Sequence, residues 1–366
     1  MKRTQNWSAI LGDAPTAGKP PENQLAKLGW QNAFAQHVDM DELAEFPPVR
    51  VFGVHRNRLQ IKGEGIQQLI MPPNGQDLSI SERATVGDWL LLDRVRERPK
   101  RVLPRKSLFK RRAPGTGRDV QLIAANIDTL FIVSSCNQDF KIARLERYMA
   151  LAHEADVEPV VVLTKVDLSD DAEHYRTRAE SVTSAAIVLL LDARRDGVSN
   201  IFAPWCQAGR TVAFVGSSGV GKSTLVNALS GEERAATQAI RENDAKGRHT
   251  TTHRQLHLMP NGALILDTPG MRELQITDVA SGLENVFSDI TSLAGTCRFS
   301  NCRHETEPGC AVLKAIEEGE IGDDKLFRWR KLVAENRHNS ASLVERKQKD
   351  RQFGKFIRAV KKANPK

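Results

Sequence analysis

The spacing of hydrophobic and polar residues changes along the chain and divides it into four regions. Residues 48–117 consist of short alternating runs, such as VRVFGVHRNRLQIKG, separated by Gly, Pro and Asn turns. This pattern is typical of a small β-barrel. An OB-fold is the natural candidate, although an SH3-like barrel or a purely structural β-domain has a similar pattern.

The segment before this region, residues 1–47, is polar at first and then has the periodicity of helices. We assign no chemistry to this N-terminal extension. The apolar positions that we expect to dock on a neighbouring domain are Leu25, Leu28, Trp30 and Phe34.

Residues 118–276 alternate between buried strands and amphipathic helices. IAANIDTLFIVSSC predicts a strand, KIARLERYMALAHEA a helix and VEPVVVL a second strand, which together form a β-α-β unit. In the last region, residues 277–366, helix-like segments lead into a basic tail. The predicted architecture is therefore a β-barrel, a central α/β domain and a helical C-terminal domain.

The strongest motif lies in the α/β region, where AFVGSSGVGKSTLVNAL joins a predicted strand at residues 211–215 to a helix. It meets the P-loop pattern G-x-x-x-x-G-K-[ST] with Gly216, Gly221, Lys222 and Ser223. The glycines let N–H groups and the helix N-terminus face phosphates. Lys222 is expected to reach the β- and γ-phosphates, and the Ser223 hydroxyl to bind Mg²⁺. The expected nucleotide contacts of the loop are Gly216, Ser217, Ser218, Gly219, Val220, Gly221, Lys222, Ser223 and Thr224.

A second motif, ALILDTPGMRE, follows the P-loop by about 50 residues. It predicts a strand that ends at Asp267, whose carboxylate suits water-mediated Mg²⁺ binding beside a P-loop. The Gly270 N–H can approach a γ-phosphate without hindrance from a Cβ atom. An Asp-x-x-Gly turn alone is common, and its position after a P-loop is what indicates a function.

A third motif, VVVLTKVDL, precedes the P-loop. Asp167 can accept hydrogen bonds from the N1–H and exocyclic amine of guanine, and adenine has no matching pair of donors, so the motif favours GTP over ATP. GTPases usually have Asn-Lys-x-Asp here, and we expect the shorter Thr164 to weaken the tie between base and P-loop. The expected contacts of this base-reading motif are Thr164, Lys165, Val166 and Asp167.

The order of these motifs differs from that of small GTPases, which begin with the P-loop. Here the base-reading motif comes first, the P-loop second and the Mg²⁺ aspartate third. Because the termini of a compact domain often lie close together, the same sheet can be threaded from a different start. We therefore predict a circularly permuted GTPase domain.

Positive charge is concentrated in two segments. Residues 94–118 contain eleven Lys or Arg and one acid, a charge of +10, and residues 341–366 contain nine and two, a charge of +7. Because the whole chain carries +8, the remainder carries −9. This distribution indicates contacts with the phosphate backbone of a nucleic acid. For the C-terminal tail, a solvated charge run is the alternative.

The segment TCRFSNCRHETEPGCAV holds three of the five cysteines and a histidine within fourteen residues. Three Cys and one His make a closed tetrahedral zinc shell, which indicates a structural site without an open position for catalytic water. The expected ligands are Cys297, Cys302, His304 and Cys310. Cys136 and Cys206 stand alone in apolar surroundings and are expected to be core residues.

The permuted motif order and the C-x4-C-x-H-x5-C spacing resemble the ribosome small-subunit-dependent GTPase A family, RsgA. The resemblance covers nearly the whole chain. It implies a GTPase that binds the small ribosomal subunit and its rRNA late in subunit maturation and leaves after GTP hydrolysis. It also implies one structural Zn²⁺, and Mg²⁺ bound with GTP.

The segment KGRHTTTHR resembles the RsgA switch. A threonine of this switch is expected to bind Mg²⁺, and spacing does not decide which; Thr250 and Thr251 are the candidates. Many GTPases have a water-orienting glutamine where Met271 stands, and methionine cannot fill that role. We expect His249 to position the water, by resemblance to the family and because imidazole can orient or deprotonate water near neutral pH. A loop histidine without a chemical role is the alternative.

The family carries a guanine-contacting loop with a Ser-Ala dipeptide, and this chain has Asp192-Ala193 there. We therefore leave this loop out of the expected site.

Length and composition fit these expectations. A chain of 366 residues with 40% hydrophobic residues can form two or three domains. No segment approaches a membrane span, and the apolar stretch near the start is too short for a signal peptide, so we expect a cytoplasmic protein, and a monomer. Two other functions fit the sequence: a GTPase that acts on a non-ribosomal RNA, and a nucleotide-gated binding module with little turnover.

Overall fold

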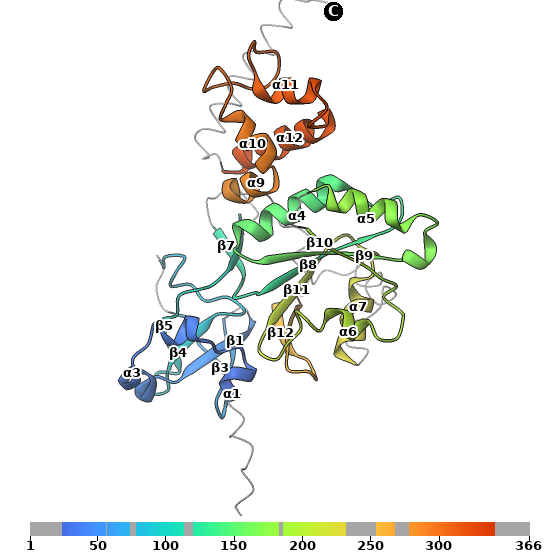
Figure 1. Cartoon of the computed structure of the whole chain (residues 1–366). Helices are drawn as coiled ribbons and strands as arrows, with labels where there is room; N and C mark the ends of the chain where they lie inside the picture. Colours follow the sequence, from blue (N-terminus) through green and yellow to red (C-terminus); the bar gives the residue numbers. More distant parts are fainter. Residues whose placement is uncertain are drawn as a thin grey trace, which may run out of the picture.

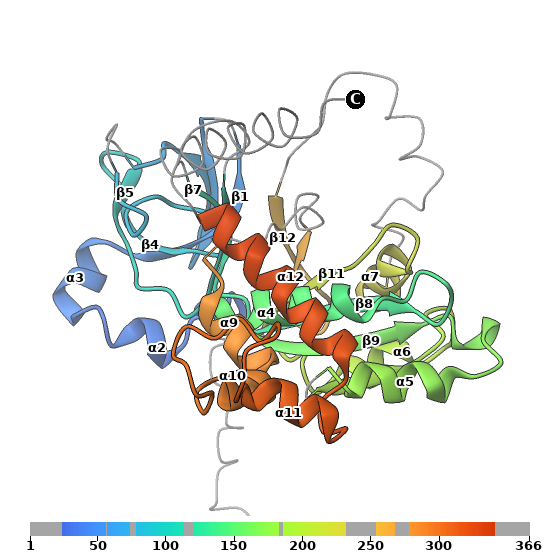
Figure 2. The same ribbon diagram turned by 90° about the horizontal axis from the view of Figure 1, so that it is seen from above.

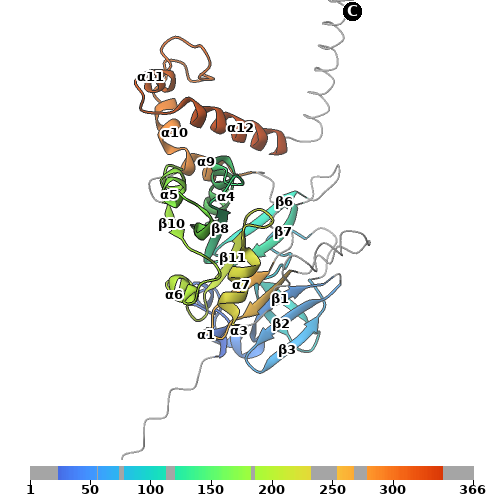
Figure 3. The ribbon, with the colours of Figure 1, turned by 90° about the vertical axis from the view of Figure 1, so that its right-hand side faces the viewer.

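The computed structural model describes residues 24–55, 57–73, 78–112, 120–182, 186–231, 254–267 and 278–340. Figure 1 shows a region of antiparallel strands in blue, an α/β domain in green and yellow, and a group of C-terminal helices in orange. The strand region and the C-terminal helices lie at opposite ends of the molecule (Figures 1 and 3).

The strand region begins with three short helices, α1 (Gln24–Lys27), α2 (Asn32–Ala35) and α3 (Met40–Glu45). Its strands are β1 (Pro48–Val54), β2 (Leu59–Gly63), β3 (Ile66–Ile70), β4 (Trp89–Asp93) and β5 (Arg98–Val102). They pair antiparallel in the order β3-β2-β1-β4-β5. The two ends of this order approach each other, because the Met71 N–H after β3 donates to the Glu97 carbonyl before β5 at 3.3 Å. Inward-facing residues form a common core of Val49, Val51, Leu59, Ile61, Ile70, Leu90 and Leu92.

The N-terminal helices dock on this region through their apolar positions. Leu28 and Phe34 are buried in a second cluster, which includes Trp89, and Leu25 and Trp30 are partly buried against that cluster. The Trp30 ring meets the buried Trp89 ring edge to face, with centroids 4.8 Å apart. The predicted docking of this extension is therefore confirmed.

A hairpin of β6 (Leu108–Arg112) and β7 (Val120–Ala125) leads into the α/β domain. The strands of this domain are β8 (Thr129–Ser135), β9 (Glu158–Thr164), β10 (Ile187–Leu190), β11 (Thr211–Val215), β12 (Arg254–Leu258) and β13 (Leu264–Asp267). Its helices are α4 (Ile142–Glu154), α5 (Ala172–Glu180), α6 (Val198–Phe202) and α7 (Lys222–Ser230). The strand order is β10-β9-β8-β11-β13-β12, in which the first five strands are parallel and β12 is antiparallel. The carboxyl ends of β9, β11 and β13 therefore share one edge of the sheet.

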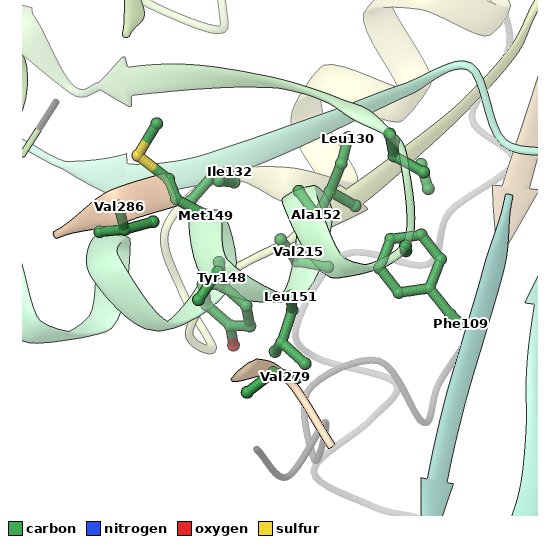
Figure 4. Packing of buried hydrophobic residues seen from close by; sticks show 14 of the residues in the cluster. Phe109, Leu130, Ile132, Tyr148, Met149, Leu151, Ala152, Val215, Val279 and Val286 are labelled. Atoms are coloured by element: carbon green, nitrogen blue, oxygen red, sulfur yellow. The ribbon is translucent and has the colours of Figure 1, made fainter. Parts of the chain in front are cut away.

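Helices cover both faces of this sheet, with α4 and α5 on one side and α6 and α7 on the other (Figure 1). Along β8, Leu130 and Ile132 belong to the core under α4, whereas Phe131 and Val133 belong to the core against α6 and α7. A strand buried on both faces is apolar without alternation, which explains the run LFIV. Figure 4 shows α4 residues packed between this sheet and the C-terminal helices.

The strand region and the α/β domain share one continuous sheet. β1 pairs antiparallel with β12, with Gly53 opposite Gln255 and Val54 opposite Arg254. In the part of the chain that the structure describes, this pairing connects eleven strands. The two domains are therefore joined by backbone hydrogen bonds in a fixed register.

A buried arginine lies at this joint. Arg50 on β1 is 2% exposed, and its guanidinium donates to the carbonyls of Leu28 at 2.7 Å, Gly87 at 3.3 Å and Asn126 at 3.2 Å. It also donates to the Thr211 hydroxyl at 2.8 Å. Burial lowers the pKa of Arg50 to about 10, so the side chain stays charged at neutral pH. One cation thus links the N-terminal extension, the strand region and the first residue of β11.

The C-terminal helices are α9 (Ala280–Val286), α10 (Ser288–Ala294), α11 (Ala311–Glu317) and α12 (Asp323–Ser340). α9 lies directly on α4, where a Cβ at Gly282 would be 2.0 Å from the Ala150 carbonyl oxygen. In Figure 4, Val286 lies beside Met149 and Val279 beside Leu151, both on α4. The joint is thus a close helix-on-helix contact.

Two ion pairs fasten α12 to the same helix, and Figure 2 shows α12 lying over the domain. Arg328 Nε donates to both carboxylate oxygens of the buried Glu146 at 2.9 Å. Arg147 makes a bidentate pair with Glu335 at 2.5 and 2.6 Å. None of the described helices is long and apolar enough to cross a membrane.

Candidate nucleotide-binding site and metal centre

The predicted P-loop joins β11 to α7, and β11 has the predicted bounds, Thr211–Val215. Gly216 has a φ of +142°, and a Cβ there would lie 2.2 Å from the Val133 carbonyl oxygen. Gly221 has a φ of +95° and immediately precedes α7. Glycine adopts positive φ angles at little cost and has no Cβ atom to clash. The loop can therefore lie close to β8 at Gly216 and enter α7 at Gly221.

Lys222 is the first residue of α7, followed in the first turn by Ser223 and Thr224. Its ammonium donates to the Gly216 carbonyl at 2.8 Å and to the Ser217 carbonyl. The loop therefore brings an ammonium, two hydroxyl-bearing residues and a helix N-terminus together, which is the arrangement of an anion site.

Thr164 connects the base-reading motif to the P-loop. It ends β9, is fully buried, and its hydroxyl lies 2.7 Å from the Val220 carbonyl oxygen and 3.2 Å from that of Ser134. Only β8 separates β9 from β11, so a short side chain can reach the loop. The Thr164 hydroxyl thus contacts the P-loop directly, and its effect on the binding of the base stays a prediction.

The chain turns sharply after β9. Lys165 has φ +58° and ψ 35°, the left-handed region, which costs a non-glycine residue about 1–2 kcal/mol. The turn leads into a short 3₁₀ helix, Val166–Leu168, that carries Asp167. The Asp167 carboxylate is 26% exposed and accepts a hydrogen bond from Arg194 Nη2 at 2.5 Å. The left-handed turn thus places the carboxylate that we predict to read the base just beyond the carboxyl end of β9.

The predicted Mg²⁺ aspartate, Asp267, is the last residue of β13. This strand runs parallel to β11 with Leu264 opposite Thr211, so it ends at the same sheet edge as the P-loop. The structure describes the backbone of Asp267. The other predicted residues of the switch segments, His249, Thr250, Thr251 and Gly270, lie outside the described residues.

The predicted zinc ligands come together in the loop between α10 and α11. The ligand atoms of Cys297, Cys302, His304 and Cys310 all lie within 4.8 Å of one another. His304 Nδ1 is 3.3 Å from the Cys310 sulfur and 3.6 Å from the Cys297 sulfur, and these two sulfurs are 3.9 Å apart. Sulfurs at about 2.3 Å from a tetrahedral Zn²⁺ are about 3.8 Å apart, so the cluster fits a four-coordinate metal.

Local backbone features hold this metal cluster. His304 is 4% exposed with a φ of +57°, and burial lowers its pKa, which favours the neutral imidazole that binds metals. Glu307 accepts hydrogen bonds from the N–H groups of Arg303, Glu305 and Thr306, which lower its pKa to about 2. The Glu307 carboxylate thus holds the turn between Cys302 and Cys310 in place.

The remaining two cysteines behave as predicted. Cys136 and Cys206 are buried in the two cores of the α/β domain. Burial raises the pKa of Cys136 to about 11 and that of Cys206 to about 12.

The basic segment at residues 94–118 is used partly inside the molecule. Arg101 pairs with Glu42, Arg105 with the buried Asp88, and Lys106 with Asp128. These three cations fasten the N-terminal extension, the strand region and β8 to one another. Arg94, Arg96 and Lys100 are exposed at or near the β4–β5 turn. Fewer cations of this segment are therefore available to a partner than its net charge of +10 indicates.

Comparison with known proteins agrees with this geometry. The model of the RsgA GTPase family matches residues 102–277. A Mesorhizobium japonicum protein named small ribosomal subunit biogenesis GTPase RsgA is 48% identical over 339 residues, which cover 90% of this chain and 94% of that protein. The chain belongs to the RsgA family of GTPases. A Vibrio parahaemolyticus RsgA, named in the same way, is 44% identical over 92% of this chain and 93% of its own length.

Solved structures support the permuted RsgA fold. The crystal structure of YjeQ from Thermotoga maritima matches with a TM-score of 0.55 and 26% identity, over 78% of this chain and 96% of that chain. YloQ, described as a circularly permuted GTPase, matches with a TM-score of 0.54 and 22% identity, over 83% of this chain and 99% of that chain. The predicted permutation is therefore confirmed at the level of the fold.

One residue beside the base-reading motif was not predicted. Arg194 lies in the loop after β10, which our sequence reasoning set aside because Asp192 replaces the RsgA family's serine. The adjacency of β10 and β9 brings this loop to Asp167. A strand order inferred for the permuted RsgA domain would have placed the two loops side by side.

Proposed function

We propose that this GTPase acts in the biogenesis of the small ribosomal subunit and that GTP hydrolysis drives its release from the subunit. The observation that carries the proposal is the identity of 44–48%, over 90% or more of this chain, to two relatives named small ribosomal subunit biogenesis GTPases. The partners are GTP or GDP and the rRNA of the small subunit, the protein acts as a monomer, and the place of action is the cytoplasm.

The nucleotide site that we propose consists of the P-loop and the base-reading motif. The residues are Gly216, Ser217, Ser218, Gly219, Val220, Gly221, Lys222, Ser223 and Thr224 for the phosphates, with Gly270 at the γ-phosphate, and Thr164, Lys165, Val166 and Asp167 for the base. The Thr164 hydroxyl bond to Val220 supports this set, because it couples the position of the base-reading turn to that of the phosphate loop. Asp167 then selects guanine by accepting two of its N–H groups.

Mg²⁺ bound with GTP supplies charge neutralisation for the phosphates. The proposed residues around it are Ser223, Thr250, Thr251 and Asp267. The proposed water-positioning residue is His249, because Met271 cannot orient water. The position of β13 beside β11 supports the role of Asp267, since its strand end meets the P-loop edge.

For the metal cluster we propose one structural Zn²⁺ held by Cys297, Cys302, His304 and Cys310. The sulfur and nitrogen separations support a closed four-coordinate shell. Such a shell stabilises the fold of the loop and leaves no position for substrate.

We further propose four domains: an N-terminal extension at 1–47, an OB-fold barrel at 48–117, the permuted GTPase domain at 118–276, and a zinc-binding domain with a basic tail at 277–366. The strand order β3-β2-β1-β4-β5, with the Met71–Glu97 hydrogen bond across its ends, supports the OB-fold. The exposed Arg94, Arg96 and Lys100 are among the described barrel residues that are available for phosphate contacts.

The test is GTP hydrolysis by the purified protein, alone and with small ribosomal subunits. Large subunits and bulk tRNA serve as controls for RNA in general, and a Lys222→Ala variant controls for contaminating GTPases. We expect stimulation by small subunits alone, and no activity in the variant under any condition.

Equal stimulation by tRNA or large subunits would overturn the ribosomal assignment and favour another RNA partner. Tight GTP binding without turnover under all conditions would instead indicate a nucleotide-gated binding module.

A further inference from the structure

The base-reading carboxylate already has a cationic partner from its own chain. Arg194 Nη2 donates to Asp167 Oδ2 at 2.5 Å. The Arg194 side chain is 67% exposed, and among the described residues its polar partners are Asp167 and Asp192. One guanidinium N–H group thus already occupies an acceptor site of Asp167 Oδ2.

The loop that carries Arg194 is fixed to the base-reading strand. The Leu191 N–H donates to the Leu163 carbonyl at 3.0 Å, which continues the β10–β9 pairing beyond the end of β10. Ala193, next to Arg194, is buried in the core of the domain. The pairing of β10 with β9 and the burial of Ala193 therefore hold Arg194 opposite Asp167.

Asp192 orients the arginine. Its Oδ1 accepts the Arg194 backbone N–H at 3.0 Å and lies 3.4 Å from Arg194 Nε. Asp192 thus gives the arginine a second carboxylate, which holds its guanidinium toward the base-reading turn.

We propose that Arg194 competes with guanine for Asp167 and thereby weakens the affinity of this GTPase for guanine nucleotides. The inference rests on the proposed nucleotide site, because it assigns the guanine to Asp167. A guanine that donates to both carboxylate oxygens of Asp167 competes with Arg194 for Oδ2. Arg194 is thus an affinity-determining residue that acts on the base and not on the phosphates.

The size of the effect follows from the exposure of the pair. An exposed ion pair stabilises its contact weakly, so its removal raises guanine affinity about two- to fivefold. GDP and GTP gain equally, since both present the same base. Adenine nucleotides gain nothing, because adenine has no donors for Asp167.

The experiment measures binding of fluorescent GDP, GTP and ATP to the full chain and to an Arg194→Ala variant. The matched control is Arg195→Ala, an exposed arginine in the same loop. Both variants lose one positive charge near a polyanionic ligand, which by itself weakens binding. We expect guanine nucleotides to bind Arg194→Ala about two- to fivefold more tightly than the parent, and Arg195→Ala to bind no more tightly.

Salt sharpens the test, since exposed pairs are screened as ionic strength rises. The affinity ratio between Arg194→Ala and the parent should shrink toward one between 50 mM and 1 M salt, and the Arg195→Ala ratio should show no such gain at low salt. An Asp192→Ser variant should fall between the parent and Arg194→Ala.

Weaker or unchanged guanine binding by Arg194→Ala overturns the inference, and weaker binding would mean that the arginine supports the bound base. If the parent binds GTP with no preference over ATP, the proposed nucleotide site fails and the inference fails with it. A parent that prefers GTP, with no gain in Arg194→Ala, leaves the proposed function intact and removes only the role of Arg194.

Discussion

The two joints that attach the outer domains to the α/β domain are built from different interactions. The strand region joins through the β1–β12 pairing and the buried Arg50, which add backbone and polar hydrogen bonds to the apolar packing of Phe52 and Trp89. The C-terminal helices join through α9 on α4, a close apolar contact with ion pairs beside it. The first joint has a specified register, because a shift of one residue would turn every side chain of the strand to the opposite face of the sheet. The second depends on a close fit between helix surfaces.

This difference predicts different responses to mutation. A polar joint loses most when one buried partner is removed, since the remaining groups stay buried without hydrogen bonds. A packed joint loses most when the close approach of its surfaces is blocked. Four changes test this comparison, from the largest expected effect to the smallest.

Arg50→Met removes the cation of the first joint. Three carbonyls and the Thr211 hydroxyl lose their partner in a site that is closed to water, so we expect the free energy of unfolding to fall by about 3–5 kcal/mol. Chemical denaturation of the full chain measures this change. Arg94→Met, at an exposed arginine, is the matched control and should cost less than about 0.5 kcal/mol. Equal losses in the two variants would contradict a special role for Arg50.

Arg328→Met leaves the buried Glu146 without its partner at the second joint. Burial already raises the pKa of Glu146, and Arg328 opposes that rise. In the variant the folded chain binds a proton that the unfolded chain releases, so stability falls as pH rises above the ordinary value of 4.5. We expect a loss of about 2–4 kcal/mol at pH 8 and a smaller loss at pH 5, measured by urea denaturation.

The control for this pH dependence is the double variant Glu146→Gln with Arg328→Met, which has no carboxylate to titrate. Its stability relative to the parent should not decline between pH 5 and pH 8. A parallel decline in both variants would assign the effect to other groups.

Gly282→Ala tests the close approach of α9 to α4. The added Cβ meets the Ala150 carbonyl oxygen at 2.0 Å, so α9 must move away, at a cost of about 1–3 kcal/mol. Hydrogen exchange should increase in α9 and α12 and stay unchanged in β1 and β12. Gly295→Ala, whose nearest contact would be 3.4 Å away, is the control and should leave exchange unaltered. Faster exchange in β1 of the Gly282 variant would mean that the two joints are coupled.

Arg147→Met removes the more exposed of the two ion pairs, whose side chains are 30% and 27% exposed. Water competes with such a pair, so we expect a loss of at most about 1 kcal/mol. A double-mutant cycle with Glu335→Gln measures the coupling. Coupling as large as that of Arg328 with Glu146 would show that burial is not what separates the two pairs.

The parts of the site that the sequence predicted are those whose residues lie close together in the chain. The P-loop strand and glycines, and the four metal-binding residues, follow from spacing alone, because a turn or a tetrahedral shell needs fixed local separations. The contacts of Thr164 with Val220 and of Arg194 with Asp167 cross between strands. They depend on which strands are neighbours, and hydrophobic periodicity carries no information about strand order.

The same reason limited the prediction of the fold. Alternation in residues 48–117 predicted β-structure, and the β-α-β unit was recognised from its pattern. The pairing of β1 with β12 was not foreseen, since nothing in either strand marks its partner. Charge was misleading for a related reason: Arg101, Arg105 and Lys106 have acidic partners that are distant in sequence.

The pairing of β1 with β12 also sets an order of events during synthesis. Val54 pairs with Arg254, which follows 200 residues later. At about 5–20 residues per second, the exposed end of β1 waits about 10–40 s for its partner strand. The strand region can fold first through β2 and β4, but its attachment to the α/β domain through β12 has to follow the synthesis of the P-loop. In this order of synthesis, the strand region can therefore fold early, and the end of β1 that pairs with β12 stays unpaired until β12 has been made.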